Sequence, residues 1–493
     1  MPGADPATAT ATELVAALAR REMSSQELLA ACLERVAAGN PRLRAVVATD
    51  LPRARAAARS ADQDRACGRC QGPLHGLPMT VKDAFETAGL VTTAGAVELA
   101  GYVPDRDADA VARLRAAGAV VYGKSNVPRY AGDFQTANQL HGRTANPWRT
   151  DRTPGGSSGG AAVAVATGMS PLELGSDIAG SIRAPAHYCG VFGHLPSWPA
   201  VPGRGHIPPA PGARAAPPLG VPGPLGRSAD DLELALTVLV GTDLAGIPGG
   251  RLPPSRLPEP VPGERRGGLA GCRVGLWLDH PLVRTDRAVA GILRQLADRL
   301  SDAGAALVER LRPPRPFYEM HEVYLRMLFA TLGATCPEPE YPALLAQPWD
   351  PATAGALRQS YRERLAVEER RARIEAGWPA RFAEVDVVLT PVTPGPAFPH
   401  DTDRPPGERE LMVDGRAVPY HLHSVWTNLA SLAGLPATVA PVGRTRDGLP
   451  VGVQVIGPRW GDRTTIGFAR WVERLAGGFT PPPVPAPAPA AAR

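Results

Sequence analysis

Apolar positions three and four residues apart predict helices at the start of the chain. This spacing covers residues 12–21 and 25–38, and an arginine- and alanine-rich helix follows to about residue 66. Ser24 and Glu27 form a capping-box pattern ahead of the second helix, and we expect Gly39 to end it. These helices are interpreted as scaffold.

Short apolar runs between turn residues replace this spacing from residue 72 onward. Residues 79–81 and 119–123 read as buried strands, and residues 107–118 between them read as a helix. Each strand is followed directly by a lysine, Lys82 and Lys124. Strands that alternate with helices predict an α/β fold.

The second half of the chain continues the alternation, with a βαβ-like unit over residues 273–311. Strands are expected at 273–278, 306–311, 385–392, 437–442 and 451–456, and helices at 228–240, 288–303, 318–333, 354–376 and 462–475.

Proline and glycine interrupt the pattern in two places. Residues 190–227 are expected to form an ordered loop without regular structure, and residues 246–267 to connect the two halves. We therefore expect a helical scaffold at 1–70, a core at 71–245, and a variable pocket region with C-terminal strands of the same α/β domain at 246–477. The remaining residues, 478–493, read as a disordered proline and alanine tail.

The rest of the chain is organised around residues 154–185, whose sequence is PGGSSGGAAVAVATGMSPLELGSDIAGSIRAP. A glycine and serine loop opens a small-residue helix that Gly168 closes, and a short strand leads into a second small-residue turn at 177–183. A flexible linker is not followed by a helix and a buried strand. Two serine-bearing loops are therefore expected on one compact core.

Charge and cysteine usage exclude several classes of protein. The net charge of +5 over 493 residues comes without a dense basic run interleaved with aromatics, so we expect no nucleic-acid partner. The six scattered cysteines are typical of a reduced intracellular protein, and Cys67 and Cys70 alone are a weak zinc signal. The chain begins without a secretory pattern and has no run of membrane-spanning length, so we expect a soluble, cytoplasmic protein without a membrane partner.

Lysine is rare in this chain. Of the 53 cationic side chains only Lys82 and Lys124 are lysines. Arginine cannot lose its proton at accessible pH, whereas lysine can, so a retained lysine is a candidate base. Retention by chance, as a surface charge, is the alternative for each.

The serine loops lack the patterns of other catalytic sites. No lysine and serine or threonine follow the glycine loop as in phosphate-loop enzymes, and the chain has no GxSxG nucleophile elbow and no GxGxxG between a strand and a helix. Anion binding by the glycine loop stays open. A catalytic serine needs a base and preorganised N–H donors, and the small side chains of the second turn would let a substrate carbonyl approach successive N–H groups.

Three motifs in order resemble those that define the amidase signature family: GLPMTVKD, PGGSSGG and LGSDIAGSIRAPAHYCGVFG. The similarity resumes at DVVLTPVTP, LASLAGLPATVAPVG and VGVQVIGP, so it covers most of the chain. Members of that family are serine hydrolases that cleave amide bonds with a Ser-Ser-Lys triad. The resemblance implies an α/β fold with a central mixed β-sheet covered by α-helices on both faces.

The resemblance also implies the site. Ser181 would be the nucleophile, Lys82 the neutral base, and Ser157 the bridging serine behind a cis peptide bond to Gly156. Further expected site residues are the oxyanion-hole N–H groups of Ile178, Ala179, Gly180 and Ser181, and the supporting pair Asp177 and Arg183. No metal or cofactor is implied.

Two positions depart from the family pattern. Ala179 stands where glycine is usual and would be strained by about 1 kcal/mol if that position needs a positive φ. Leu195 stands where lysine is usual, outside the triad.

The implied function is an amidase that hydrolyses a small-molecule carboxylic acid amide through a serine acyl-enzyme. Two alternatives stay open: an acyl transferase that forms amides in a biosynthetic pathway, and the glutamine-hydrolysing subunit of a tRNA-dependent amidotransferase. A non-catalytic binding protein is disfavoured by the intact triad. The oligomeric state is also open, with a homodimer as one alternative.

Overall fold

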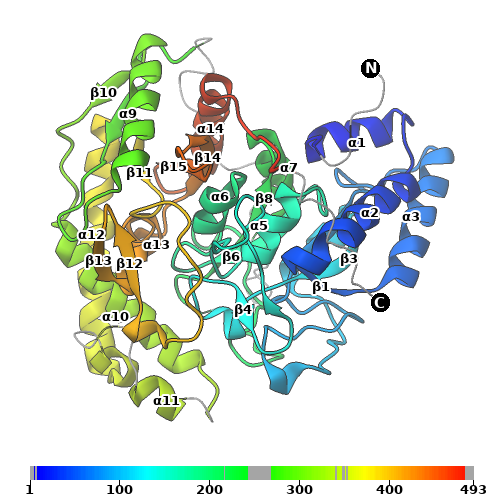
Figure 1. Ribbon diagram of the computed structural model, residues 1–493, viewed down its shortest axis with the longest axis horizontal. Helices are drawn as coiled ribbons and strands as arrows, with labels where there is room; N and C mark the ends of the chain where they lie inside the picture. The colour runs from blue at the N-terminus through cyan, green and yellow to red at the C-terminus, as the bar shows by residue number, and fades with distance from the viewer. Residues whose placement is uncertain are drawn as a thin grey trace, which may run out of the picture.

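One mixed β-sheet of 11 strands runs through the centre of the molecule (Figure 1). The computed structural model describes residues 5, 8–215, 217–241, 268–338, 341–346, 350 and 354–483. The predicted connection at 246–267 and most of the predicted tail, 484–493, lie outside these residues. In spatial order the strands are β1 (Val46–Thr49), β3 (Val120–Ser125), β2 (Pro78–Lys82), β6 (Glu173–Asp177), β8 (Val221–Gly226), β7 (Phe192–Leu195), β14 (Ala437–Arg444), β15 (Pro450–Ile456), β11 (Val387–Pro391), β9 (Arg273–Leu276) and β10 (Ala306–Val308).

Strand direction changes across the sheet. The neighbours β3, β2 and β6 are parallel, as are β11, β9 and β10, and the other pairings are antiparallel. Two further hairpins join β4 (Ala137–Asn138) to β5 (Gly142–Arg143) and β12 (Glu410–Val413) to β13 (Arg416–Pro419). The predicted mixed α/β fold is confirmed.

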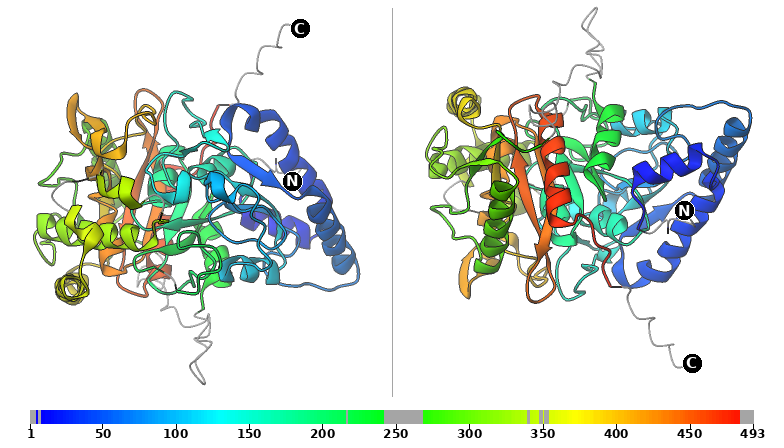
Figure 2. Two further views of the ribbon diagram at one scale, coloured as in Figure 1. Left: turned by 90° about the horizontal axis from the view of Figure 1, so that it is seen from below. Right: turned by 90° about the horizontal axis from the view of Figure 1, so that it is seen from above.

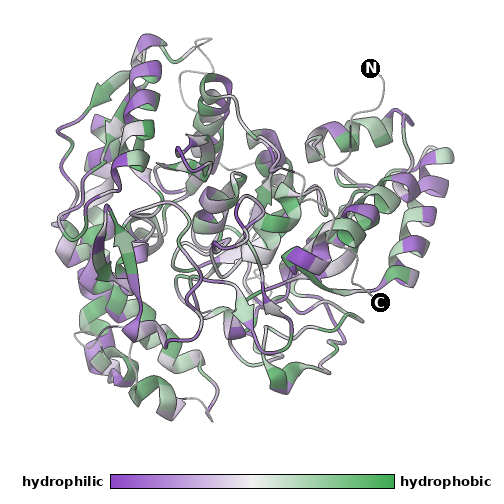
Figure 3. Cartoon of the chain, in the orientation of Figure 1, coloured by the Kyte–Doolittle hydropathy of each residue, from purple (hydrophilic) through white to green (hydrophobic). Residues whose placement is uncertain are grey.

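Helices cover both faces of the sheet (Figure 2). Val439 and Ala440 are successive residues of β14 and point to opposite faces. Val439 packs in a core with α5 (Gly159–Ala166) and α6 (Arg183–Cys189), whereas Ala440 packs with α7 (Ala229–Leu239), α9 (Arg287–Asp302) and α14 (Asp462–Ala476). The outer helices show the expected bands of hydrophobic and hydrophilic residues (Figure 3).

The remaining helices pack against the sheet in two groups, the first four with β2, β3 and β6 and the last four with β7, β11, β14 and β15. They are α1 (Ala11–Ala19), α2 (Ser25–Leu43), α3 (Leu51–Ala66), α4 (Asp109–Ala116), α10 (Phe317–Thr335), α11 (Tyr341–Ala346), α12 (Tyr361–Glu384) and α13 (Asn428–Ala433), with 3-10 turns η1 (Val97–Leu99), η2 (Arg129–Ala131), η4 (Ala354–Arg358), η5 (Pro406–Glu408) and η6 (Tyr420–Ser424). Within the described ranges no helix is long and apolar enough to cross a membrane.

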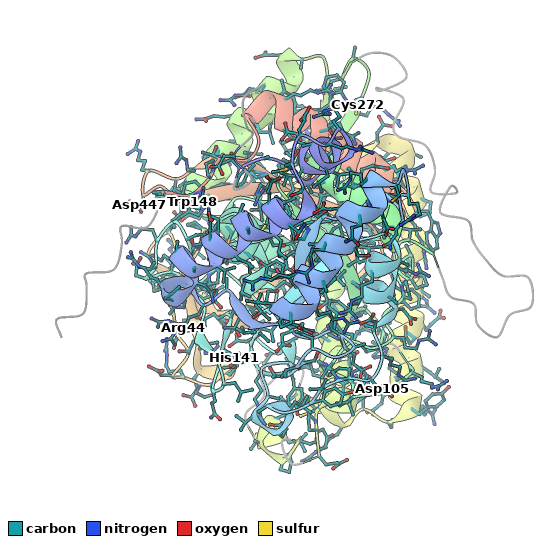
Figure 4. The ribbon with its side chains drawn as sticks, turned by 90° about the vertical axis from the view of Figure 1, so that its right-hand side faces the viewer. Arg44, Asp105, His141, Trp148, Cys272 and Asp447 are labelled. Carbon is teal, nitrogen blue, oxygen red and sulfur yellow. The ribbon has the colours of Figure 1, made fainter. Side chains whose placement is uncertain are left out.

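Helix α2 does not end at Gly39, so that prediction is wrong. Gly39 instead leaves space for Met169, whose terminal methyl would lie 2.8 Å from a Cβ at this position. The helix continues to Leu43 and ends at Arg44, which has φ +51°. Its last turn is held by Asn40, whose side-chain oxygen accepts the N–H groups of two residues beyond the helix. Figure 4 shows Arg44 beside the loop that carries His141, where Asn126 bridges the two segments.

Residues 190–227 are not free of regular structure, because they contain β7 and β8. Glycine allows the close approach: a Cβ at Gly223 would lie 2.3 Å from the carbonyl oxygen of His194. Pro222 and Pro224 are tolerated because β7 pairs only with the last two residues of β8. The prolines therefore lie where β8 has one neighbour, as on a sheet edge.

The helix expected at 354–376 is also displaced. A 3-10 turn occupies 354–358, and α12 begins at Tyr361 behind a capping box made by Ser360 and Glu363. The pattern of serine and glutamate three residues apart marks this start in the sequence.

Candidate active site

Lys82 is the last residue of β2, and its side chain is completely buried. Its Nζ atom lies 2.7 Å from Ser157 Oγ, 2.9 Å from Ser176 Oγ and 3.4 Å from the Ser176 carbonyl oxygen. Burial lowers the pKa of Lys82 to about 7, although the carboxyl groups of Asp177 and Glu173 act in the opposite direction. The amine is thus poised to be neutral near neutral pH.

Ser157 lies in the glycine loop that precedes α5. Helix α5 lies near the centre of the molecule (Figure 1). Gly155 has φ +85°, and Gly156 fits so tightly that a Cβ would lie 2.6 Å from the carbonyl oxygen of Gln135. Thr136 holds the loop in place, because its hydroxyl donates to the Gly155 carbonyl and accepts from the N–H of Gly159. The peptide bond between Gly156 and Ser157 is cis.

Ser181 lies in the turn between β6 and α6. Asp177 shapes this turn, because its carboxylate accepts the N–H groups of Gly180, Ile182 and Arg183. The Arg183 guanidinium adds two hydrogen bonds to the same carboxylate, at 3.0 and 2.9 Å. Burial opposes ionisation of Asp177, but these partners hold its pKa below the ordinary value.

The predicted oxyanion turn differs from expectation at two residues. The N–H of Gly180 donates to Asp177, which leaves the N–H groups of Ile178, Ala179 and Ser181 without acceptors among the described residues. The positive φ belongs to Gly180, at +100°, and not to Ala179. The hypothesised strain at Ala179 is therefore absent.

Two residues from the second half of the chain support this turn and carry no signal in the sequence. Tyr324 of α10 donates its hydroxyl to the Ile178 carbonyl at 3.2 Å. Thr427 donates to the Ala179 carbonyl at 3.1 Å, and its own carbonyl accepts from Arg183 at 2.7 Å. These contacts join residues more than a hundred positions apart, so only the fold reveals them.

One cavity is lined by Ser157, Ser176 and Ser181, and Lys82 is hydrogen-bonded to the hydroxyl of Ser157. No hydrogen bond joins Ser157 to the Ser181 hydroxyl among the described residues. The other walls are mainly apolar, and the full lining is Tyr130, Ala131, Ser157, Ser176, Asp177, Ile178, Ser181, Gly203, His206, Pro208, Pro217, Gly220, Val221, Pro222, Thr331, Leu332 and Thr335. In this set Asp177 is the one carboxylate, and Arg183 neutralises it.

The other singled-out residues lie outside this cavity. Lys124 is also fully buried, so a surface charge is the wrong interpretation for both lysines; it donates to the Phe85 carbonyl and to the hydroxyls of Thr87 and Thr92. Leu195 is buried in β7. No group of three or more metal-ligating side chains occurs in the part of the chain that the structure describes.

The chain matches known proteins along almost its whole length. A family model described as Amidase matches residues 27–466. A curated glutamyl-tRNA(Gln) amidotransferase subunit from Anaeromyxobacter sp. (strain K) is 34% identical over 500 residues, which cover 96% of this chain and 97% of that protein.

Solved structures agree in fold. The native peptide amidase of Stenotrophomonas maltophilia superimposes with a TM-score of 0.77 at 30% identity, covering 97% of this chain and 99% of that one. A glutamyl-tRNA(Gln) amidotransferase subunit of Thermotoga maritima gives a TM-score of 0.79 at 26% identity, covering 99% and 100%. The three motifs, the fold and these similarities lead to one conclusion: the chain belongs to the amidase family, that of the amidase signature enzymes, which act as amidohydrolases.

Proposed function

We propose that the protein hydrolyses a carboxylic acid amide through an acyl-enzyme on Ser181. The observation that carries this proposal is the 2.7 Å contact between Lys82 Nζ and Ser157 Oγ at the wall of a cavity that Ser181 also lines. Burial gives the lysine a pKa of about 7, so a large fraction of it is neutral and able to accept a proton.

The proposed proton path runs from Ser181 to Ser157 to Lys82. As the Ser181 proton moves to Ser157 and the Ser157 proton to Lys82, Ser181 Oγ forms a bond to the carbonyl carbon. When the C–N bond breaks, the leaving nitrogen takes the proton back through Ser157. Water then attacks the ester by the same path and releases the acid.

The oxyanion would be held by the N–H groups of Ile178, Ala179 and Ser181, which have no other acceptor within the described ranges of the chain. Asp177 and Arg183 act as supports, because their hydrogen bonds fix the turn that carries Ser181. Preorganised donors of this kind contribute about 2.7–4 kcal/mol each to other acyl-transfer enzymes.

There is a second candidate function, that of a glutamine-hydrolysing amidotransferase subunit. The names of the curated relatives favour this candidate over a free-standing amidase. Both candidates share the chemistry on Ser181 and differ in substrate. Glutamine carries an α-ammonium and an α-carboxylate, and the described lining of the cavity offers no unpaired charge to either. This lining supports an amide whose acyl group is uncharged.

Two assays test the proposal. A fluorophosphonate probe followed by peptide mass spectrometry should place the label on Ser181, and Ser181→Ala should abolish it. Ammonia release should then be compared between glutamine and uncharged aliphatic, aromatic and peptide amides. Hydrolysis of glutamine alone would assign the second candidate, and labelling of another residue would overturn the shared mechanism.

A further inference from the structure

Besides Ser157, Lys82 contacts a second hydroxyl, that of Ser176, from which a hydrogen-bonded chain continues to a histidine. Ser176 Oγ lies 2.9 Å from Lys82 Nζ and 2.8 Å from His206 Nε2. The other ring nitrogen, His206 Nδ1, lies 3.0 Å from the carbonyl oxygen of Pro208. His206 belongs to the stretch 190–227, which the sequence pattern leaves without an assigned role.

The carbonyl of Pro208 determines the tautomer of His206. A carbonyl oxygen can only accept, so Nδ1 must carry the ring proton that points at it. In the neutral ring Nε2 is then an acceptor, and the Ser176 hydroxyl must donate to it. Burial, together with the charge of Lys82 and more weakly that of Lys124, lowers the pKa of His206 to about 4, which keeps the ring neutral.

The orientation of Ser176 then determines the orientation of the Lys82 amine. Since the Ser176 proton points at His206, Ser176 Oγ can only accept from Lys82. The Ser176 carbonyl, 3.4 Å away, takes the second N–H. A neutral amine has two N–H bonds and one lone pair, so the lone pair is left for the third neighbour, Ser157 Oγ at 2.7 Å.

We infer that His206 is a positioning residue that, through the Ser176 hydroxyl, directs the lone pair of Lys82 at the proton of Ser157. Without the imidazole acceptor, the Ser176 hydroxyl is free to turn and donate to the lone pair itself. The lone pair of Lys82 would then accept from Ser176 and could not take the proton of Ser157. The inference rests on the proposed function, since it gives His206 a task in the proton path to Ser181.

Local packing holds the imidazole in place. Its ring meets Phe85 edge-on at 5.0 Å, and the backbones of the two residues form an isolated β-bridge. Gly205 approaches Ala108 so closely that a Cβ would lie 2.6 Å from its Cα, which fixes the backbone just before the histidine. His206 thus presents Nε2 to Ser176 from a fixed position.

Two amide variants separate the role of the acceptor from that of the packing. His206→Gln places an amide oxygen near the position of Nε2, whereas His206→Asn reaches only the position of Nδ1, so it keeps the Pro208 contact and loses Ser176. The readout is the rate constant for fluorophosphonate labelling of Ser181, with the melting temperature as a check of folding. His400→Leu, a histidine change outside the cavity lining, is the control.

We expect the Asn variant to label Ser181 at least tenfold more slowly than the wild type, and the Gln variant to stay within about threefold of it. Adding His206→Asn to Ser176→Ala should slow labelling no further, because both changes act through one hydroxyl. Wild-type rates in the Asn variant, or equally slow Gln and Asn variants, would overturn the inference. Failure of the wild-type protein to label at Ser181 would instead overturn the proposed function.

Discussion

Asp177 and Arg183 form an ion pair with no exposed side-chain surface, 2.9 Å apart, inside the turn that carries Ser181. The carboxylate also accepts three backbone N–H groups, and the guanidinium also reaches Thr427, Ser431 and Gln454. A buried pair of this kind makes the turn rigid at the cost of desolvation, and its members depend on one another.

Removing one member of this pair should therefore damage the fold. Asp177→Ala leaves the Arg183 charge buried without its partner, and we expect the free energy of unfolding to fall by about 3–5 kcal/mol in urea denaturation. Glu22→Ala breaks the exposed Arg20 and Glu22 pair and is the control, with no measurable change expected. Equal stability of both variants would show that the buried pair does not hold the turn.

Exchange of Gly180 should slow the labelling of Ser181, whereas exchange of the neighbouring Ala179 should leave it nearly unchanged. Gly180→Ala puts a side chain at φ +100° and a Cβ 2.8 Å from Thr427 Cγ2, so we expect labelling of Ser181 to slow at least tenfold. Ala179→Gly should stay within about twofold of the wild type, because the φ of Ala179 is not positive. A Gly180→Ala variant with the wild-type rate would contradict the assigned turn geometry.

The mixed sheet and the grouping of Lys82, Ser157 and Ser181 are predicted by the resemblance of the motifs to the amidase signature family. The local pattern predicts only an α/β alternation with a lysine after a strand and two serine-bearing loops on one core. Neither the resemblance nor the pattern predicts Tyr324 or Thr427, which reach the turn only through tertiary packing. The sequence pattern also fails to predict strands β7 and β8. Their glycines and prolines allow close approach of the backbones, so these strands lack the alternation of apolar and polar residues by which a strand is recognised.

Exchange of Lys124, the second buried lysine, should affect the stability of the protein and not the pH dependence of Ser181 labelling. Lys124→Arg must fit a larger group among the Phe85 carbonyl and the hydroxyls of Thr87 and Thr92, so we expect a loss of about 1–3 kcal/mol in the free energy of unfolding. The pH dependence of Ser181 labelling should not change, because Lys124 does not line the cavity. A displaced pH profile with unchanged stability would place Lys124 in the proton path.

The rate of Ser181 labelling at acid pH tests whether Lys82 acts as a neutral base. Burial lowers the pKa of Lys82 to about 7, so the base is protonated and inactive below that pH and free above it. The rate of Ser181 labelling should accordingly rise about tenfold per pH unit below pH 7 and level off above it. Glu173 and Asp177 oppose this shift, so removing either charge should move the limb to lower pH.

The most direct measurement is the labelling rate of Ser181 in Lys82→Arg and Lys82→Ala, followed from acid to alkaline pH. Arginine preserves the charge but cannot release its proton. We predict that both variants lose nearly all activity and that the acid limb with an apparent pKa of about 7 disappears. If Lys82→Arg kept more than about a tenth of the wild-type rate, a loss under about 1.4 kcal/mol, Lys82 would serve as a positioning charge and the proton path through Ser157 would be contradicted.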